Sequence, residues 1–378
     1  MGDMPLTLDP ATFLRDHWQR TPLLIRDGWP GWVNPLVPDD LAGLAGDPDV
    51  EARLVTATGS DWRVEHGPFA AERFASLGDC DWTLLVQAVD HAVPAVAALL
   101  DAFAFIPNWR VDDIMVSYAA DGGGVGPHFD AYDVFLVQGL GQRCWRVGGP
   151  CDAATPLRPH DDLRLLADFT PLAEYVLDPG DILYLPPGIA HDGVAVGGDC
   201  MTYSIGFRAP SAADLIGGWA DDLLAGLPAA RYADPGLTAP ANPGEITPAA
   251  LADLRAMITR HLADPDAFAR WFGAYVSTRK YPDLDWAPAK PVTAATLRRR
   301  LAKTPFVARN PASRFAFIRT ADGVVLFVDG VVFDCTGDTV VLAEALCAVP
   351  RIPIAPQVSD AATAILVALV NTGSITIG

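Results

Sequence analysis

The first 210 residues alternate between short apolar runs and turn-forming residues, and this alternation limits the folds open to the chain. The runs include DDIMVSYAA, DVFLVQG, EYVLDPGDILYLPPG and MTYSIGFRAP, and Gly, Pro and Asp separate them. Short apolar runs bounded by turn residues are typical of strands, and a succession of them predicts a β-sandwich or a β-barrel. Two earlier segments, DPATFLRDHWQR and VPAVAALLDAFA, have helical patterns and are expected to pack outside the strands. We therefore predict a mainly β domain over residues 1–210.

The pattern becomes helical from residue 211. Ser211 is a good N-cap, and apolar residues then recur at four-residue spacing. Thr247 and Pro248 are typical of the start of a further helix. Its apolar stripe consists of Leu251, Leu254, Ile258 and Leu262. Such stripes beyond a complete barrel have to be buried against a second subunit or against the barrel itself. We favour the second subunit, so residues 211–287 are predicted to form a helical dimerisation region of a homodimer.

The remaining residues, 288–378, alternate between helical and strand patterns, which predicts a small α+β module of the winged-helix type. This module contains a basic run of Arg298, Arg299, Arg300 and Lys303. Such a run is compatible with nucleic-acid contact, but one helix with a solvated basic face explains it better. Because the chain is very acidic, we expect no direct binding of nucleic acid.

Composition narrows the class of protein further. With 378 residues, 51% of them hydrophobic, the chain is long enough for two or three domains, yet no apolar run approaches the roughly 18 residues of a membrane span. The N-terminal residues lack the basic and apolar regions of a secretory signal, and the six cysteines form no CxxC pair. We expect a cytoplasmic protein with reduced thiols. Its formal charge of −19 would attract a basic protein partner.

Two histidines and one aspartate carry the predicted chemistry. His128 and Asp130 in GGGVGPHFDAYDVF are two residues apart, so on a strand both side chains point to the same face. The segment DPGDILYLPPGIAHDG adds His191 after a rigid Pro-Pro-Gly turn. Two imidazoles and one carboxylate form the facial triad of non-haem iron(II) oxygenases, which leaves positions open for a bidentate cosubstrate and dioxygen. His128, Asp130 and His191 are therefore predicted to be the metal ligands and the catalytic centre.

Four segments together resemble a known family. GGGVGPHFDAYDVF, GQRCWRVG, DPGDILYLPPGIAHDG and YSIGFRAP are similar to the JmjC-type oxygenases of the cupin superfamily, and specifically to the bacterial ribosomal oxygenases. FLRDHWQRTPLLI resembles the N-terminal signature of the same group. The resemblance implies a double-stranded β-helix, the jelly roll of cupins, followed by a helical dimerisation region and a winged-helix-like domain. It also implies Fe(II), 2-oxoglutarate as cosubstrate, and dioxygen.

The resemblance assigns the cosubstrate site as well. Arg143 matches the arginine that binds the distal carboxylate of 2-oxoglutarate, and a planar guanidinium suits a carboxylate bidentately. Arg146 is the alternative. Ser117 is expected to assist from the neighbouring strand, whereas Ala119 stands where the family leads us to expect a serine. The second anchor of 2-oxoglutarate is therefore not assigned by the sequence.

Bacterial members of the family hydroxylate the β-carbon of an arginine in a protein of the large ribosomal subunit, and eukaryotic relatives act on histidine. A pocket for a cationic side chain needs a carboxylate, and Asp113 shares strand parity with Ser117. Tyr132 and Ser204 are further candidates for the pocket wall. The expected activity is thus hydroxylation of an arginine in a basic ribosomal protein. Hydroxylation of a histidine, lysine demethylation and a non-catalytic scaffold in ribosome assembly are the alternatives.

Overall fold

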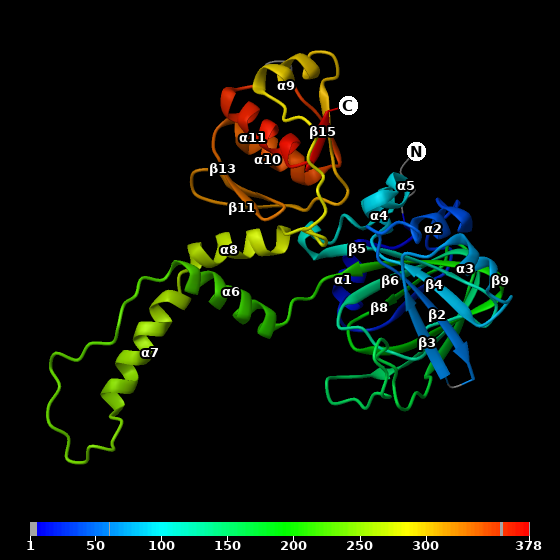
Figure 1. Cartoon of the computed structure of the whole chain (residues 1–378), viewed down its shortest axis with the longest axis horizontal. Coiled ribbons are helices and arrows are strands. Elements are labelled where there is room, and N and C mark those ends of the chain that lie inside the picture. Colours follow the sequence, from blue (N-terminus) through cyan, green and yellow to red (C-terminus); the bar gives the residue numbers. More distant parts are fainter. Residues whose placement is uncertain (1–5, 60, 356–357, 378) are drawn as a thin grey trace. The chain divides into compact units, whose positions relative to one another are not determined.

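The computed structural model describes residues 6–59, 61–355 and 358–377. The chain forms two compact units, Met1–Ala209 and Pro210–Gly378 (Figure 1). The helical and winged-helix segments both belong to the second unit. Their separation into two domains at residue 287 stays a prediction.

A nine-stranded antiparallel sheet dominates the first unit, and it wraps around an interior (Figure 1). The strand order is β1-β8-β6-β9-β5-β4-β2-β3, and β7 pairs with β6. The strands are β1 (Leu23–Ile25), β2 (Ala52–Thr58), β3 (Asp61–His66), β4 (Trp82–Val86), β5 (Val111–Ala119), β6 (Asp133–Pro150), β7 (Ala173–Leu177), β8 (Ile182–Leu185) and β9 (Ile189–Phe207). The mainly β jelly roll predicted for this part of the chain is confirmed.

Two long strands, β6 and β9, pair along most of their length and let the sheet bend back on itself. The register shifts between Gln138 and Leu140 and again between Leu140 and Gln142. Gly141 lies within the second shift and has a φ of 61°. Such a bulge bends the strand, and glycine adopts this conformation without strain. The end of β6 that follows the bend carries Arg143.

The two faces of the sheet differ in chemistry, because successive side chains of a strand point to opposite faces. The outer face packs under the short N-terminal helices α1 (Pro10–Asp16) and α2 (Pro38–Leu44), and its core includes Phe13, Phe103 and Tyr184. The inner face combines an apolar cluster with buried polar side chains. These polar residues are Thr83, Ser117, Gln138, Arg143 and Thr202. Buried polar groups on the inside of a barrel indicate a site for a polar ligand.

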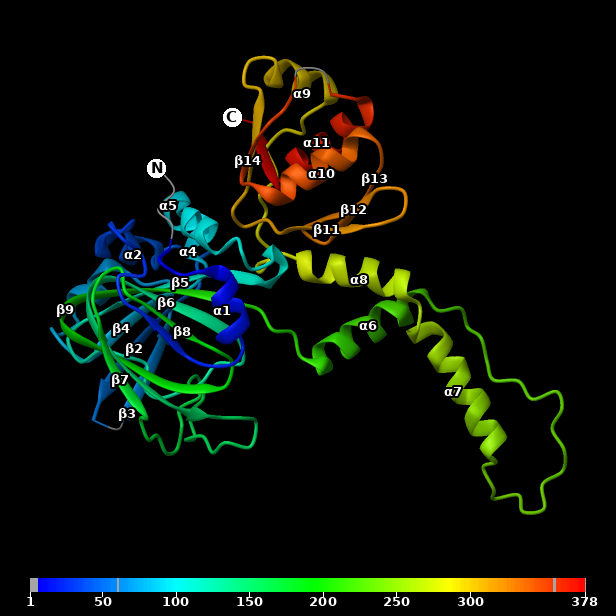
Figure 2. The ribbon, with the colours of Figure 1, turned by 180° about the vertical axis from the view of Figure 1, so that it is seen from behind.

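The second unit begins with the helices α6 (Ala212–Gly226), α7 (Pro248–Leu262) and α8 (Pro265–Ser277). Ser211 caps α6 in a reciprocal hydrogen-bonded arrangement with Asp214, as predicted. Trp219 of α6 packs against Phe268 and Trp271 of α8. By contrast, α7 has no buried residue, and Figure 2 shows no other helix or strand of the described part of the second unit packed along it.

The winged-helix part comprises three helices and two small sheets around one core. The helices are α9 (Ala294–Leu301), α10 (Asp338–Ala348) and α11 (Asp360–Asn371). One sheet has the order β14-β10-β15, with β14 (Arg351–Pro353), β10 (Phe306–Arg309) and β15 (Ile375–Ile377). The other is β11-β12-β13, with β11 (Phe315–Arg319), β12 (Val324–Val328) and β13 (Val331–Cys335). This confirms the predicted small α+β module.

Two further predictions can be compared with the structure. None of the six cysteines forms a disulfide in the part of the chain that the structure describes. Among the residues that the structure describes, no helix is long and apolar enough to cross a membrane.

Candidate metal centre

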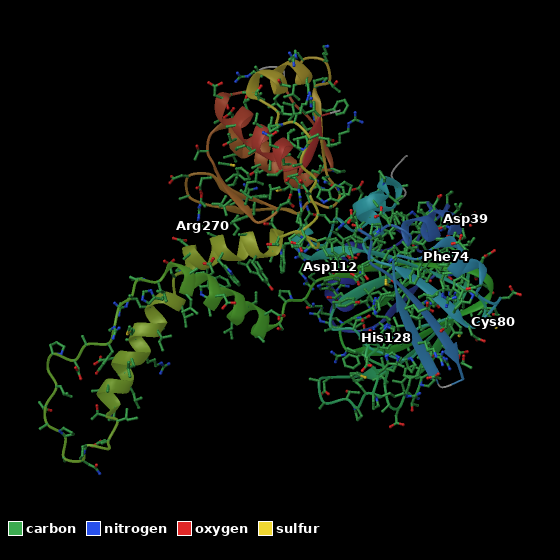
Figure 3. The ribbon with its side chains drawn as sticks, viewed as in Figure 1. Asp39, Phe74, Cys80, Asp112, His128 and Arg270 are labelled. Atoms are coloured by element: carbon green, nitrogen blue, oxygen red, sulfur yellow. The ribbon has the colours of Figure 1, made fainter. Side chains whose placement is uncertain are left out.

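The three predicted ligands come together in the first unit, where Figure 3 labels His128 among the strands. The nitrogen and oxygen atoms that His128, Asp130 and His191 can offer to a metal lie within 4.8 Å of one another. His191 is the third residue of β9. The Oδ2 atom of Asp130 lies 3.6 Å from Nε2 of His191. The residues are partly exposed except for His191, which is buried.

The expectation that the H-x-D segment is itself a strand was wrong. His128 forms only an isolated antiparallel bridge with His191, through two backbone hydrogen bonds of 2.8 and 2.9 Å between these residues. The next contact is made by the Pro-Pro-Gly turn, where the amide of Gly188 donates to the carbonyl of Asp130 at 2.7 Å. Gly188 has a φ of 78°, which suits glycine. Because the turn takes this backbone contact, the ladder does not continue past His128.

Both histidines present the same ring nitrogen to the centre. The Nδ1 atom of His128 lies 2.9 Å from the carbonyl oxygen of Gly126, and that of His191 lies 2.9 Å from the carbonyl oxygen of Ile189. A carbonyl only accepts, so Nδ1 carries the proton and Nε2 keeps its lone pair for a metal. Burial lowers the pKa of His191 to about 4, the neighbouring His128 adds to this effect, and Asp130 opposes it. His191 is therefore neutral at pH 7, as a metal ligand must be.

These ligands fit Fe(II). Imidazole and carboxylate suit iron, and no thiolate points to zinc or to an iron–sulfur cluster at this cluster of ligands. Three ligands from one side leave coordination positions for a cosubstrate and dioxygen.

Arg143 provides the second half of the site. Its side chain is buried on β6, and its Nη1 atom donates a long hydrogen bond of 3.4 Å to the carbonyl of Gly193. The Nε and Nη2 atoms are buried without a hydrogen-bond partner. An unpaired buried cation is unfavourable by itself, so this pocket is suited to an anion. A carboxylate that accepts from Nε and Nη2 would satisfy both atoms bidentately.

The register between β6 and β9 places Arg143 on the same face as the triad. Arg143 is opposite Ala195, and Val147 is opposite His191. Arg146 has the other parity, lies opposite Asp192 and forms an ion pair with it. The guanidinium of Arg146 is thus already paired away from the metal centre. This favours Arg143 for the cosubstrate, in line with the sequence-based preference.

Trp145 lies between the metal ligands and Arg143 on the inner face. Its ring centroid is 5.9 Å from that of His191, and the guanidinium carbon of Arg143 is 5.7 Å from the centre of its ring. Gly193 permits this position, because a Cβ atom there would approach the Trp145 ring to 2.5 Å. The indole N–H is buried without a partner. Trp145 therefore forms an apolar wall that offers one donor to a bound molecule.

The remaining predicted residues lie in different settings. Ser117 is buried on β5, and its Oγ lies 3.5 Å from the carbonyl of Thr202, which is a long hydrogen bond. Ala119 packs with Ala195 and Cys200. Because residue 119 is alanine, this position offers no hydroxyl group to a ligand. Ser204 is half-buried on β9, opposite Leu136, whose side chain belongs to the inner apolar cluster.

Two substrate-site candidates contact their surroundings in ways that the sequence did not indicate. Asp113 is buried, and its Oδ2 accepts from Nε2 of Gln87 at 2.7 Å and from the amide of Ala88 at 2.8 Å. This carboxylate therefore supports the left-handed turn at Ala88, where φ is 51°. Tyr132 is 43% exposed and lies next to the triad, where partial burial of the phenol and the charge of Asp130 raise its pKa above the usual value.

Sequence reasoning missed three of these features. They are the indole of Trp145, the proximity of the Tyr132 phenol to the Asp130 carboxylate, and a buried hydroxyl at Thr83. A polar residue inside the apolar run WTLLV was the signal available for Thr83. The other two depend on how distant strands pair, which the sequence alone does not specify.

Comparison with known proteins gives consistent matches over both units. Residues 98–215 match the JmjC domain family, and residues 260–376 match the ROXA-like winged helix. The chain is 43% identical over 287 residues to the ribosomal protein uL16 3-hydroxylase of Escherichia coli. This match covers 76% of each of the two chains. It is 46% identical over 217 residues to a probable ribosomal oxygenase of Haemophilus influenzae. This match covers 57% of the present chain and 53% of the Haemophilus protein.

Solved structures match over the whole chain. The X-ray structure of E. coli ycfD is 35% identical, has a TM-score of 0.91 and covers 99% of this chain and 100% of that chain. The structure of the E. coli ribosomal oxygenase YcfD in complex with cobalt and 2-oxoglutarate has a TM-score of 0.87 at 35% identity, and the match covers 99% of each chain.

The jelly roll, the His-Asp-His triad and the buried arginine define a JmjC-type oxygenase that depends on 2-oxoglutarate. Its cofactors are Fe(II), 2-oxoglutarate as cosubstrate, and dioxygen. Within that class, the chain belongs to the ribosomal oxygenase family.

Proposed function

We propose that this protein hydroxylates the β-carbon of an arginine side chain in a protein of the large ribosomal subunit. The observation that carries the proposal is the 43% identity to an enzyme named ribosomal protein uL16 3-hydroxylase, together with the intact triad and Arg143. The cytoplasm, where ribosomes are assembled, is the proposed place of action. We expect no direct contact with nucleic acid.

The residues of the chain divide the work between them. When bound, iron(II) with 2-oxoglutarate and dioxygen would supply the oxidation: one oxygen atom of dioxygen enters a C–H bond of the substrate, and the other enters succinate, which forms as 2-oxoglutarate loses carbon dioxide. His128, Asp130 and His191 hold the metal, and Arg143 binds the distal carboxylate of the cosubstrate. Tyr132 lies close to Asp130, and we propose that its hydroxyl donates to that carboxylate and fixes its orientation. The ring of Trp145 and the inner apolar cluster exclude water from the site.

The charge distribution supports a basic substrate. Residues 1–209 contain 30 Asp and Glu residues but only 12 Arg and no Lys, so nearly all of the net charge of −19 belongs to the oxygenase unit. An acidic surface around an active site attracts a basic protein and accelerates its encounter.

The proposed pocket for the substrate side chain consists of Asp113, Tyr132 and Ser204. Asp113 lies on the inner side of β5, with its Oδ1 3.9 Å from the position that a Cβ atom at Gly206 would take. A carboxylate here would neutralise an arginine of the substrate. The Tyr132→Phe variant keeps the ring and removes the hydroxyl, so it is expected to lower kcat more than it raises KM for the protein substrate. An unchanged kcat would remove Tyr132 from the proposed site.

We further propose that the protein is a homodimer formed through α6 and α7. The apolar residues of α7 are largely exposed: Leu251 by 55%, Leu254 by 38%, Ile258 by 62% and Leu262 by 46%. A stripe of this kind is typical of an interface between subunits. The Leu251→Asp/Ile258→Asp double variant is expected to elute as a monomer when its mass is measured by light scattering. Arg260→Asp, a charge change on the opposite face of the same helix, serves as the control and should leave the dimer intact. A wild-type protein of monomer mass would contradict the proposal.

The central test is intact-protein mass spectrometry of large-subunit ribosomal proteins incubated with the enzyme, Fe(II), 2-oxoglutarate and air. Gain of one oxygen atom on a single protein, absent with the His128→Ala variant, would support the proposal, and fragmentation would locate it on an arginine. Oxygen on a histidine instead would favour the alternative of a histidine hydroxylase. Release of succinate without a modified ribosomal protein would direct the search to another substrate. Iron-loaded protein that neither binds nor consumes 2-oxoglutarate would favour a non-catalytic scaffold.

A further inference from the structure

Thr83 carries a buried hydroxyl group without a hydrogen-bond partner. The residue is 0% exposed and is the second residue of β4, and its Oγ1 is one of the few buried side-chain polar atoms of the described chain that make no hydrogen bond. Leaving a buried hydroxyl without a hydrogen bond costs free energy. Such a group therefore suggests a ligand that accepts its hydrogen bond when it is bound. Arg143 and Trp145 are the other residues of the oxygenase unit with such atoms.

The strand register places Thr83 beside the cosubstrate pocket. Thr83 lies directly opposite Ala119 of β5, so both side chains point to the same inner face. Ala119 packs in one cluster with Ala195, and Ala195 lies directly opposite Arg143. A continuous row of small side chains thus leads from Thr83 to Arg143. Because these side chains are small, a bound molecule at Arg143 has room to approach the hydroxyl of Thr83.

Thr83 also compensates for an absence in this chain. Position 119, where the family resemblance leads to the expectation of a serine, has no hydroxyl group. Ser117 and Thr202 are further buried hydroxyls of the inner face, but each already has an acceptor, namely the carbonyl of Thr202 for Ser117 and Oε1 of Gln138 for Thr202. The hydroxyl of Thr83 therefore has the position and the free donor that Ala119 lacks.

We propose that Thr83 is the second anchor of 2-oxoglutarate: its hydroxyl donates a hydrogen bond to the distal carboxylate that Arg143 binds. A carboxylate accepts about four hydrogen bonds, and one guanidinium fork satisfies two of them. In a pocket shielded from water, a further donor has to come from the protein. Thr83 acts as a positioning residue, and the inference rests on 2-oxoglutarate as cosubstrate but not on the identity of the protein substrate.

The test measures ligand binding to the Mn(II)-loaded protein without oxygen, by calorimetry, so it does not depend on turnover. Thr83→Val has the shape of threonine without the hydroxyl, and is expected to weaken 2-oxoglutarate binding about tenfold, because a hydrogen bond to a charged group is lost. Thr83→Ser is expected to bind within about twofold of the wild type. Thr56→Val is the matched control: Thr56 is half-buried on β2, and the adjacent Val55 is the residue opposite Thr83, so Thr56 points to the other face.

A second ligand identifies the end of the molecule that Thr83 contacts. 2-Oxopentanoate has the same keto-acid end, with a methyl group in place of the distal carboxylate, and its affinity is expected to be the same in Thr83→Val and wild type. Equal losses for both ligands, or no loss for 2-oxoglutarate, would overturn the proposal. If Thr83→Val does not fold, Thr83→Ala and Thr83→Ser form a second pair that differs only in the hydroxyl, and equal affinity of these two for 2-oxoglutarate would refute it. Absence of any hydroxylated ribosomal protein would leave this result untouched.

Discussion

Replacing Arg143 by methionine is expected to have opposite effects on stability with and without the cosubstrate. In the ligand-free protein, Nε and Nη2 of Arg143 are buried and unpartnered. Removal of an unsatisfied buried polar group is expected to raise the free energy of unfolding by about 1–3 kcal/mol. The variant loses the long bond to Gly193 and the contact with the Trp145 ring, which together are worth about 1 kcal/mol. The ligand-free variant should therefore be more stable by about 1 kcal/mol, which raises Tm by roughly 2–4 °C for a unit of this size.

Saturation with 2-oxoglutarate should reverse this order. A ligand present at 100 times its Kd stabilises the protein that binds it by about 2.7 kcal/mol. The wild type gains this free energy, whereas Arg143→Met lacks the charge that holds the distal carboxylate and gains almost none. The Tm of the wild type should then exceed that of the variant.

Scanning calorimetry of the Mn(II)-loaded proteins under nitrogen measures both values. The control is Arg146→Met, which breaks the ion pair with Asp192. It should be less stable than wild type under both conditions, with an unchanged shift on addition of 2-oxoglutarate. The reasoning would be refuted if ligand-free Arg143→Met melted below the wild type, since the guanidinium would then be satisfied in the empty site. A full 2-oxoglutarate shift in Arg143→Met would refute the assigned role.

Three further outcomes are expected. His128→Ala and Asp130→Ala should each abolish release of succinate and leave the Tm of the metal-free protein almost unchanged, because both side chains are partly exposed; a large fall in Tm would make the site structural. Dialysis against a chelator should abolish turnover but leave the circular dichroism spectrum intact, and Fe(II) should restore activity; unfolding on chelation would contradict a centre formed in advance. The kcat/KM for a basic ribosomal protein should fall steeply as salt rises while 2-oxoglutarate affinity changes little, and a rate independent of salt would contradict electrostatic capture by the acidic unit.

Much of the fold and the metal centre could be predicted because local patterns specify them. The strands of the barrel follow from apolar runs between turn residues, and the capping of α6 follows from Ser211 and Asp214. The ligands could be found because their spacing and the Pro-Pro-Gly turn are local features of the sequence. The buried guanidinium of Arg143, whose Nε and Nη2 atoms have no hydrogen-bond partner, is consistent with the role that the resemblance assigned to it.

The rest depends on pairing between distant segments. His128 and His191 form an isolated bridge and not the expected strand, because the amide of Gly188, which lies in a turn, donates to the next available carbonyl, that of Asp130. The role of Asp113 in supporting Ala88 depends on β4 lying beside β5. The position of Thr83 near Arg143 involves four strands. No periodicity within one segment contains this information.

The two backbone hydrogen bonds between His128 and His191 have a consequence for how the enzyme acquires iron. They join two ligands from distant parts of the chain through the backbone, so the cost in conformational entropy of bringing these ligands together is met when the barrel folds. We therefore expect the native structure to survive loss of the metal and to accept iron again. The fraction of enzyme that holds iron is then expected to follow the supply of iron around it.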